Sequence, residues 1–437
     1  MKINILVITK SPWNNTNTVG NTLSNLFRGW DGAEFYNIYL REEVPNNDVC
    51  NNYYRITEKQ LMKHFIQPSK IGQELSSNDF DELRTFSNYI DRQEKEKRML
   101  DFFRNNRATV FLFFREVIWK IGRWNNKKLD AFLENNRFDC IFAFGADPIY
   151  LQNIVLYCAI RANARLFLYF VDDIYSNTSY SPLGLLYKCT LRRAIKRTVV
   201  QATKIYGISK ELCDEYEAIF NRKIELLHKC CDFTNTVVRS IVSHPINIVY
   251  AGNLYYGRKD ILGALADEIE KINHSDTQIR LDIYTSATIT PEINEEFNRG
   301  ASTRVLGTRT YEEIKGILSK ADLVLHVESF DKKQILLTRL SFSTKITDCL
   351  QSGNGVMVIG PNNVASIRYL GSIPGAIVIN SLDDIGQALD KIVADPRIII
   401  TSASRLNDYV KSNCNTNDVR AMLQNDFSAY KMRKEHI

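Results

Sequence analysis

Short apolar runs alternate with helix-length amphipathic stretches along most of the chain, which is the pattern of parallel α/β sheets. The runs that predict strands in the first part of the chain are residues 3–8, 33–40, 139–144, 165–171, 204–208 and 224–228. Those in the second part are residues 246–250, 279–284, 303–306, 323–327, 356–359 and 376–379. Two successive sets of strands with helices between them predict two Rossmann-like domains of the α/β class.

Two segments interrupt this pattern and suggest how the domains are divided. Residues from about 45 to 135 are first polar and then helical, which predicts a helical insertion in the N-terminal domain. Residues 234–245 are polar and lose the periodicity, so we place the interdomain linker there. We therefore expect an N-terminal domain over residues 1–240, a C-terminal domain over residues 246–400 and a helical tail over residues 401–437.

The stretch from 321 to 361 predicts a buried strand, a polar loop, a helix that opens near Ser343 and Thr344, and a second strand. Lys345 falls in the first turn of that helix, where the macrodipole disfavours a cation by up to ~1 kcal/mol. A bound diphosphate would remove this conflict, and Asp348 on the same helix face could accept hydrogen bonds from sugar hydroxyls. The alternative is an i,i+3 ion pair on a solvated surface.

A glycine and two basic residues open the second domain. Gly252 follows the strand at 246–250 and allows a ligand to approach the backbone, while Arg258 and Lys259 sit where the next helix starts. Together with Lys345, a cation here would stabilise the charge that grows on a departing diphosphate. Ordinary surface basic residues are the alternative.

Strand ends also carry acidic residues. Asp172 and Asp173 follow the strand at 165–171, the position where α/β sheets place working residues. The only Asp-x-Asp is residues 79–81, which does not follow a strand, and no paired histidines occur at metal-ligand spacing. We therefore expect no metal and no other cofactor.

Composition narrows the function classes. The 437-residue chain is 44% hydrophobic and 24% charged, as in soluble globular proteins, and its net charge of +6 suits an anionic ligand or membrane surface rather than nucleic acid. Nine cysteines without a CxxC pair indicate reduced cytosolic thiols. Without a signal peptide or an apolar run of about 20 residues, we expect a cytoplasmic protein.

Two basic stretches raise the possibility of membrane contact. Aromatic and aliphatic residues at 110–121 lie among several arginines and lysines, which fits a helix on an anionic membrane surface. A helix buried on two sides is the alternative. The basic stretch at 187–197 could likewise meet lipid head groups, although a solvated basic face explains it as well.

The order of these motifs resembles the GT-B class of glycosyltransferases, and within it the retaining enzymes of family 4. The residues that carry the resemblance are 252–259, 341–353 and Gly360-Pro361, with weaker matches at Ile208-Ser209 and 226–233. The resemblance implies two Rossmann-like domains facing a cleft, with the nucleotide-sugar on the C-terminal domain and the acceptor on the N-terminal one. It also implies terminal helices that cross back to the first domain.

Carried onto this sequence, the resemblance assigns roles to individual residues. Arg258 or Lys259, with Lys345, would hold the diphosphate; Asp348 would bind the ribose; and Asp172 or Asp173 would lie near the transferred sugar. The candidate catalytic residues are Asp172, Asp173 and Glu328. The candidate donor- and diphosphate-binding residues are Gly252, Asn253, Arg258, Lys259, Ser343, Thr344, Lys345, Asp348 and Gly360.

The sequence departs from the family pattern in two places. The family's paired acids usually sit eight residues apart, but Leu340 stands eight residues before Asp348, and Glu328 precedes Asp348 by twenty. Glu328 could serve the donor sugar through the intervening loop, or the sugar-contacting acid is missing. Asn253 stands where many relatives carry arginine.

We therefore expect a metal-independent glycosyltransferase that moves a hexose from a UDP- or GDP-sugar, with retention of configuration. Its acceptor would be a surface glycan, such as a lipid-linked or capsular or exopolysaccharide intermediate, at the inner face of the plasma membrane. A nucleotide-sugar 2-epimerase of the same fold and a non-catalytic two-domain ligand-binding protein are the alternatives.

Overall fold

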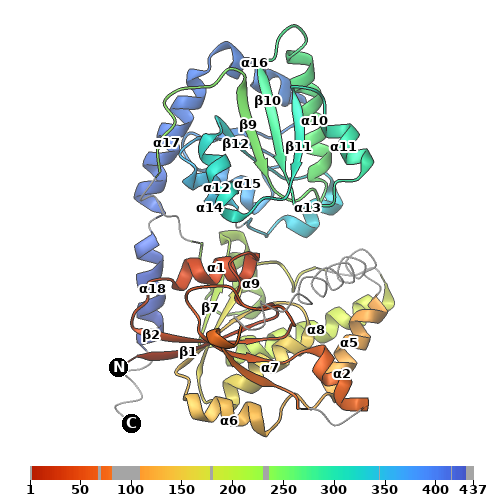
Figure 1. Ribbon diagram of the computed structural model, residues 1–437, viewed down its shortest axis with the longest axis vertical. Helices are drawn as coiled ribbons and strands as arrows, with labels where there is room; N and C mark the ends of the chain where they lie inside the picture. Colours follow the sequence, from red (N-terminus) through yellow and green to blue (C-terminus); the bar gives the residue numbers. More distant parts are fainter. Residues whose placement is uncertain are drawn as a thin grey trace. The chain divides into compact units, whose positions relative to one another are not determined.

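The computed structural model describes residues 2–66, 70–80, 109–177, 181–229, 236–343, 345–414 and 416–429. The chain forms two compact units (Figure 1). Unit 1 comprises Met1–Ile208, Leu212–Leu227 and Arg420–Ile437. Unit 2 comprises Ser209–Glu211 and His228–Val419. The main segment of unit 2 thus begins at His228, ahead of residues 234–245, where the sequence places the linker.

Unit 1 is built on a sheet of order β4-β3-β2-β1-β5-β6-β7-β8. Its strands are β1 (Ile3–Thr9), β2 (Ala33–Tyr39), β3 (Asn52–Arg55), β4 (Gln73–Ser76), β5 (Cys140–Phe144), β6 (Arg165–Phe170), β7 (Lys204–Gly207) and β8 (Glu225–Leu226). Only the β3–β4 pairing among these strands is antiparallel. From β1 the sheet is extended on one side by β2, β3 and β4 and on the other side by β5 to β8. The carboxyl ends of β1 and β5 therefore flank a topological switch point.

Helices cover both faces of this sheet. They are α1 (Thr18–Phe27), α2 (Glu58–Ile66), α5 (Thr109–Ile121), α6 (Lys127–Asn136), α7 (Ile149–Arg161), α8 (Pro182–Gln201), α9 (Lys210–Phe220) and α18 (Thr416–Ser428). Side chains set several of their starts: Asn17 accepts from the Gly20 amide at α1, and Ser181 caps α8 just before a proline at its first position. Helices α2, α5, α7 and α8 pack on one another.

Helix α18 completes the core of unit 1 although it follows unit 2 in the chain (Figure 1). The Phe427 ring is fully buried, with its centroid 4.1 Å from that of Phe167 and 5.6 Å from that of Trp30. The Arg420 guanidinium donates to the Asn25 carbonyl at 2.9 Å. An aromatic side chain buried in this way stabilises a fold by about 3–5 kcal/mol relative to alanine.

The insertion differs from its predicted helical character, because β3 and β4 lie within it and extend the sheet. Helix α5 also leaves much of its apolar stripe in solvent, the stripe being the residues that the sequence places at helical spacing: Val110, Phe113, Phe114, Val117, Ile118 and Ile121. Ile118 is buried, but Phe114, Val117 and Ile121 are 58%, 50% and 58% exposed. The described part of this helix is therefore not buried on two sides.

Polar contacts explain how α5 is turned. Trp119, which lies off the predicted stripe, is fully buried and stacks on Tyr150 with centroids 4.3 Å apart. Its indole N–H donates to Glu58 at 3.1 Å, and the Nε of Arg115 donates to the same carboxylate oxygen at 2.7 Å. These contacts hold the Trp119 side of the helix against its neighbours and leave the stripe facing outward.

Unit 2 contains an all-parallel sheet of order β11-β10-β9-β12-β13-β14. Its strands are β9 (Ile246–Ala251), β10 (Ile279–Tyr284), β11 (Thr303–Gly307), β12 (Leu323–Val327), β13 (Gly355–Ile359) and β14 (Ile377–Ile379). The switch point lies between β9 and β12. Every residue of β12 and β13 is buried, as expected for central parallel strands covered on both faces.

Two groups of helices pack around this sheet. The helices are α10 (Arg258–Ile272), α11 (Pro291–Phe297), α12 (Tyr311–Lys320), α13 (Lys332–Thr338), α14 (Ile346–Gln351), α15 (Ala365–Gly371), the 3₁₀ turn η1 (Leu382–Asp384), α16 (Ile385–Ala394) and α17 (Arg397–Asn413). Helix α10 packs with α11 and α16, while α14 packs with α12 and α17. No helix among the described residues is both long and apolar enough to cross a bilayer.

Two predictions in this region are corrected by the structure. The predicted loop between β12 and α14 contains α13, whose first amides are capped by Asp331 through the N–H groups of Lys333 and Gln334. Helix α14 begins at Ile346, so Lys345 is its N-cap rather than part of its first turn. Lys345 therefore precedes the helical amides instead of lying along them.

Candidate functional site

The carboxyl ends of β9 and β12 bring a buried ion pair to the switch point of unit 2. Arg258 is the first residue of α10, and its guanidinium donates to Glu328 Oε1 at 2.7 Å, directly after β12. The same guanidinium donates to Asn253 Oδ1 at 2.9 Å and to the Val327 carbonyl at 3.3 Å. Three acceptors thus fix both the position and the plane of this cation.

Glycines allow the backbone to close around this pair. Gly257 has a φ of 71°, and a Cβ there would lie 2.4 Å from the Ser329 hydroxyl oxygen, so only glycine fits before Arg258. At Gly360, after β13, a Cβ would approach Glu328 Cβ to 3.2 Å and Ile367 Cδ1 to 2.7 Å. The loops after three neighbouring strands therefore meet at Glu328.

A second cation lies near the first. Burial among protein atoms and repulsion from Arg258 lower the pKa of Lys345, while Asp348 opposes the shift. Because Lys345 as a residue is exposed, water screens part of this effect. Burial, Arg258 and Lys345 together lower the pKa of His326 to about 3, so this ring is neutral at pH 7. Both cations thus act on His326, near the carboxyl end of β12.

The buried carboxylate of Glu328 balances only part of this charge. Burial raises the pKa of Glu328, and Arg258 opposes that rise. Its Oε1 lies 3.7 Å from the Nε2 of the neutral His326, which contacts the Ser366 hydroxyl at 3.1 Å. Its Oε2 is buried without a hydrogen-bond partner among the described residues. This end of the sheet therefore combines two cations with one acid, the Glu328 carboxylate.

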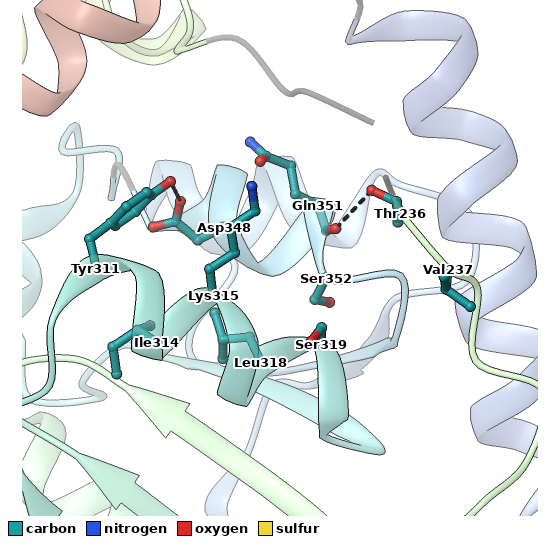
Figure 2. A pocket seen from close by; sticks show the side chains of 10 residues that line it. All are labelled: Thr236, Val237, Tyr311, Ile314, Lys315, Leu318, Ser319, Asp348, Gln351 and Ser352. Carbon is teal, nitrogen blue, oxygen red and sulfur yellow. Dashed lines mark hydrogen bonds between the residues drawn. The ribbon is translucent and has the colours of Figure 1, made fainter. Parts of the chain in front are cut away.

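Asp348 borders a separate cavity of about 260 Å³ beside α12 and α14 (Figure 2). Its carboxylate accepts from Lys229 Nζ at 3.3 Å and from the Tyr311 hydroxyl at 3.2 Å. The residues that line the cavity are Thr236, Val237, Tyr311, Ile314, Lys315, Leu318, Ser319, Asp348, Gln351 and Ser352. Figure 2 shows the Tyr311–Asp348 pair at one end of this group and Gln351 beside Thr236 at the other.

Sequence reasoning missed Lys229 and Tyr311. The Lys229 side chain is only 4% exposed, and its ammonium lies 5.7 Å from the centre of the Tyr311 ring. Lys229 falls inside the weakly matching stretch 226–233, but no spacing in the sequence ties it to Asp348. Only the fold reveals that Asp348 is already engaged by a cation and a phenol.

The other predicted donor residues make the following contacts. Lys259 lies 2.7 Å from Glu296 on α11, so Arg258 is the basic residue that reaches the crevice. Ser343 Oγ accepts from the Lys345 amide at 3.4 Å. The amide of Gly252 donates to the Tyr284 carbonyl at 2.9 Å. Thr344 lies outside the described residues.

The predicted acids of unit 1 have different environments. Asp173 is buried, and its Oδ1 accepts from the Tyr216 hydroxyl at 3.0 Å and from the Ser176 amide at 2.9 Å. Asp172 is exposed, and its carbonyl accepts from the Ile174 amide at 3.0 Å. Asp173 therefore orders the loop after β6, while Asp172 is the acid at the surface.

Metal-ligating side chains do not gather in the part of the chain that the structure describes. Within those residues, no group of three or more His, Cys, Asp or Glu side chains is placed to hold a metal ion.

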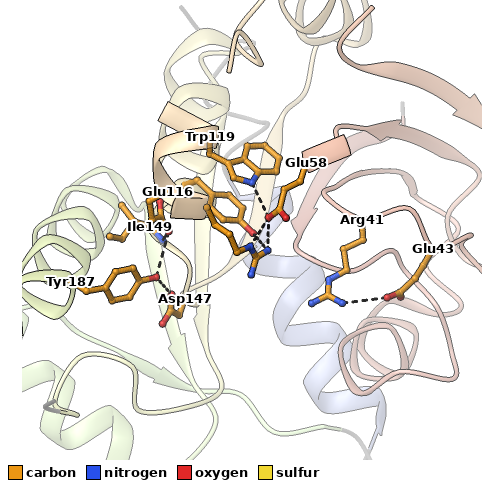
Figure 3. Close-up of polar contacts among 10 residues, drawn as sticks. Arg41, Glu43, Glu58, Glu116, Trp119, Asp147, Ile149 and Tyr187 are labelled. Carbon is orange, nitrogen blue, oxygen red and sulfur yellow. Dashed lines mark hydrogen bonds and ion pairs between the residues drawn. The ribbon is translucent and has the colours of Figure 1, made fainter. Parts of the chain in front are cut away.

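A charged cluster occupies the carboxyl edge of the sheet in unit 1 (Figure 3). Lys10 follows β1, Arg41 comes two residues after β2, and Asp147 comes three residues after β5. The Nη1 of Arg41 lies 3.4 Å from Glu43, and the Tyr187 hydroxyl donates to Asp147 (Figure 3). Because these strands are parallel, their ends place the cluster at the switch point of unit 1.

Glu116 in this cluster gives unit 1 a pH-dependent stability. Burial, with repulsion from Asp147, raises the pKa of Glu116 to about 7, although the Ile149 amide donates to it at 2.9 Å. The folded state thus holds a proton that the unfolded chain releases near pH 4.5. Stability from this group is present at low pH and is lost as the pH rises from about 4.5 to 7.

We expect Glu116→Gln to remove that dependence. Between pH 5 and pH 8 the wild-type protein should lose about 1–2 kcal/mol more unfolding free energy than the variant, because an ionised Glu116 faces Asp147 in a partly buried site. Urea denaturation of both proteins at the two pH values measures this difference. Equal losses would show that Glu116 ionises normally.

Comparisons with known proteins support the fold. No family model matches the sequence, and a search of curated proteins finds no match. The structural neighbours are GT-B glycosyltransferases, and they match nearly the whole chain, so the prediction of two Rossmann-like α/β domains of the GT-B type is confirmed.

Particular neighbours share this fold at low sequence identity. Alr3699/HepE of Anabaena, solved in complex with UDP and glucose, has a TM-score of 0.62 and 12% identity, with 98% of this chain and 100% of that chain covered. Sucrose-phosphate synthase from Thermosynechococcus elongatus has a TM-score of 0.62 and 10% identity, with 100% of both chains covered. The structure described as trehalose-6-phosphate from E. coli, bound with UDP-2-fluoro glucose, has a TM-score of 0.57 and 11% identity. The match covers 97% of this chain and 98% of that chain.

Proposed function

We propose that this protein is a glycosyltransferase that takes a hexose from a UDP- or GDP-sugar. The observation that supports this most directly is the Arg258 guanidinium, which Glu328 and Asn253 hold at the switch point of unit 2, with Lys345 at the start of α14 acting on the same His326 ring. Ligands of open α/β sheets bind in the crevice outside the carboxyl ends of the strands at such a point. Solved neighbours of the same fold were determined with UDP or a UDP-sugar.

In this proposal the two cations bind the donor diphosphate and stabilise the negative charge that develops on it as the sugar departs. Glu328 positions the Arg258 guanidinium, and we propose that it serves the donor sugar from the end of β12. The ribose hydroxyls would bind at Asp348, next to the cavity of about 260 Å³. Asp172 is the surface acid proposed to lie near the transferred sugar.

We further propose transfer with retention of configuration, as the resemblance to family 4 implies. Because two protein cations meet the diphosphate charge, we propose that no metal ion is required. Addition of EDTA is then expected to leave nucleotide release unchanged.

The proposed acceptor is a surface glycan, lipid-linked or a capsular or exopolysaccharide intermediate, at the inner face of the plasma membrane. Two neighbouring helices of unit 1 support a lipid environment. On α5, Phe111 and Phe114 are 45% and 58% exposed, and on the adjacent α8, Leu185 and Leu186 are 48% and 54% exposed. Basic side chains of α8, such as Arg193 and Lys196, could meet anionic head groups.

Release of UDP or GDP from a panel of nucleotide sugars tests the proposal. We expect Lys345→Ala to slow release by at least tenfold, because one of the two diphosphate contacts is lost. Lys332→Ala is the matched control, since this lysine is exposed on α13 and should leave release unchanged.

Three other results would contradict the assignment. Unchanged release in Lys345→Ala would show that the site is misplaced. Nucleotide-dependent thermal stabilisation without any turnover would favour a binding protein. Conversion of the nucleotide-sugar to its epimer, without sugar transfer, would favour an epimerase.

A further inference from the structure

The ammonium of Lys10 in unit 1 has an unusual environment. It makes no hydrogen bond or ion pair with the described residues, although it stands directly after β1 at the switch point of that sheet. Burial, together with repulsion from Arg115 and Arg41, lowers the pKa of Lys10 to about 8. Asp147 and Glu58 act in the opposite direction but more weakly than the two arginines.

The two arginines are held in place by acids that lie on their other sides. Arg115 donates to Glu58 at 2.7 Å and to the Tyr150 hydroxyl at 3.0 Å, and Arg41 pairs with Glu43 at 3.4 Å. Lys10 lies beside the strand end that carries Arg41, because the Leu40 amide donates to the Lys10 carbonyl at 3.1 Å, and both arginines lower the pKa of Lys10. A lysine that is crowded by cations and lacks its own partner is the arrangement that an incoming anion would stabilise.

We propose that Lys10, Arg41 and Arg115 bind a phosphate group of the acceptor. This inference rests on the proposed function for the acceptor's identity, but the anion site itself depends only on unit 1. Phosphate fits better than a carboxylate because it can meet three cations with three oxygens and up to two charges. A neutral sugar would leave the field at Lys10 uncompensated.

Helix α5 connects this site to the apolar surface. It carries Arg115, whose guanidinium lies in the cluster, and Phe114, which is exposed. One helix thus combines a phosphate contact with an outward-facing aromatic ring. The phosphate could therefore belong to a lipid-linked acceptor or to a soluble sugar phosphate, and the experiment below separates these sources.

Calorimetric titration with inorganic phosphate tests the site directly. The titration uses the full chain carrying Lys345→Ala, so that the proposed donor site binds the probe more weakly. We expect Lys10→Met in this background to weaken phosphate binding at least tenfold, while Lys128→Met, at an exposed lysine on α6, leaves it unchanged. Arg41→Gln should weaken binding as well. Urea denaturation should show that Lys10→Met is no less stable than its parent, because a partly desolvated charge has been removed.

The source of the phosphate follows from a second measurement, sedimentation with phosphatidylcholine vesicles that do or do not contain phosphatidic acid. Loss of phosphatidic-acid-dependent sedimentation in Lys10→Met indicates a lipid phosphate, whereas phosphate binding without sedimentation indicates a soluble one. Absence of phosphate binding, or binding unaffected by Lys10→Met and Arg41→Gln, overturns the inference. If the wild-type protein turns over no nucleotide-sugar while phosphate binding still depends on Lys10, only the proposed transferase activity is refuted.

Discussion

Replacing Arg258 with alanine is expected to lower kcat/KM for the nucleotide-sugar by about 100-fold or more, because a preorganised cation at a leaving group contributes several kcal/mol to the transition state. The structure explains why this residue should matter so much. Its guanidinium is only 14% exposed and is fixed by Glu328, Asn253 and the Val327 carbonyl. Steady-state release of UDP or GDP provides the measurement.

The neighbouring lysine supplies a matched control. Lys259→Ala removes the same charge one position away, but that ammonium pairs with Glu296 outside the crevice, so activity should remain within about twofold. Because Arg258→Ala leaves Glu328 buried and unpaired, the double variant Arg258→Gln with Glu328→Gln tests whether loss of activity is merely loss of fold. A folded double variant with normal activity would contradict the role assigned to Arg258.

Replacing Asp322 with alanine is expected to destabilise unit 2 by about 3–5 kcal/mol, since it removes one partner of a buried ion pair. Asp322 is fully buried just before β12. Its Oδ1 accepts from Arg239 Nε at 2.9 Å and from the Ser243 amide at 3.0 Å, and its Oδ2 accepts from the Asn247 amide at 2.8 Å. Alanine would leave a guanidinium and two backbone amides without these acceptors.

Hydrogen exchange locates this loss within the molecule. Amides of β9 and β12 should exchange faster in the Asp322→Ala variant, while those of β1 and β5 in unit 1 should change little. Asp395→Ala is the control, because Asp395 pairs with an Arg397 side chain that is 84% exposed, and solvent screening should make its loss nearly neutral. Equal effects of the two substitutions would show that the Asp322 network contributes little.

Much of unit 2 could be predicted because its strands are buried on both faces. The runs at 279–284 and 323–327 coincide with β10 and β12. A central parallel strand must be apolar throughout, so its ends are marked wherever polar residues resume. Gly252 after β9 and the basic residues at the start of α10 could also be named from the sequence, although their role in binding a ligand stays a prediction.

Short elements and long-range partners could not be predicted. Strands β3 and β4 are four residues each, mix polar with apolar positions, and depend on pairing with a sheet that forms elsewhere in the chain. The sequence alone does not say whether Arg258 or Lys259 faces the end of β12, because adjacent helical residues point in different directions. The structure distinguishes them by their partners: Arg258 pairs with Glu328, and Lys259 pairs with Glu296. Lys229 and Asp348 form an ion pair although they are 119 residues apart in the sequence, and hydrophobic periodicity carries no information about such long-range pairs.

The packing of Phe427 has a consequence for how the chain is made. The hydrophobic interior around Phe167 lacks one of its rings until the ribosome has translated everything from His228 to α18. The later-coded unit can therefore finish folding before the earlier-coded one, which reverses the usual N-terminal-first order. A nascent chain that ends before Phe427 leaves the aromatic residues around Phe167 more exposed. We expect chaperones to bind such a chain and proteases to degrade it more readily than the fully translated protein.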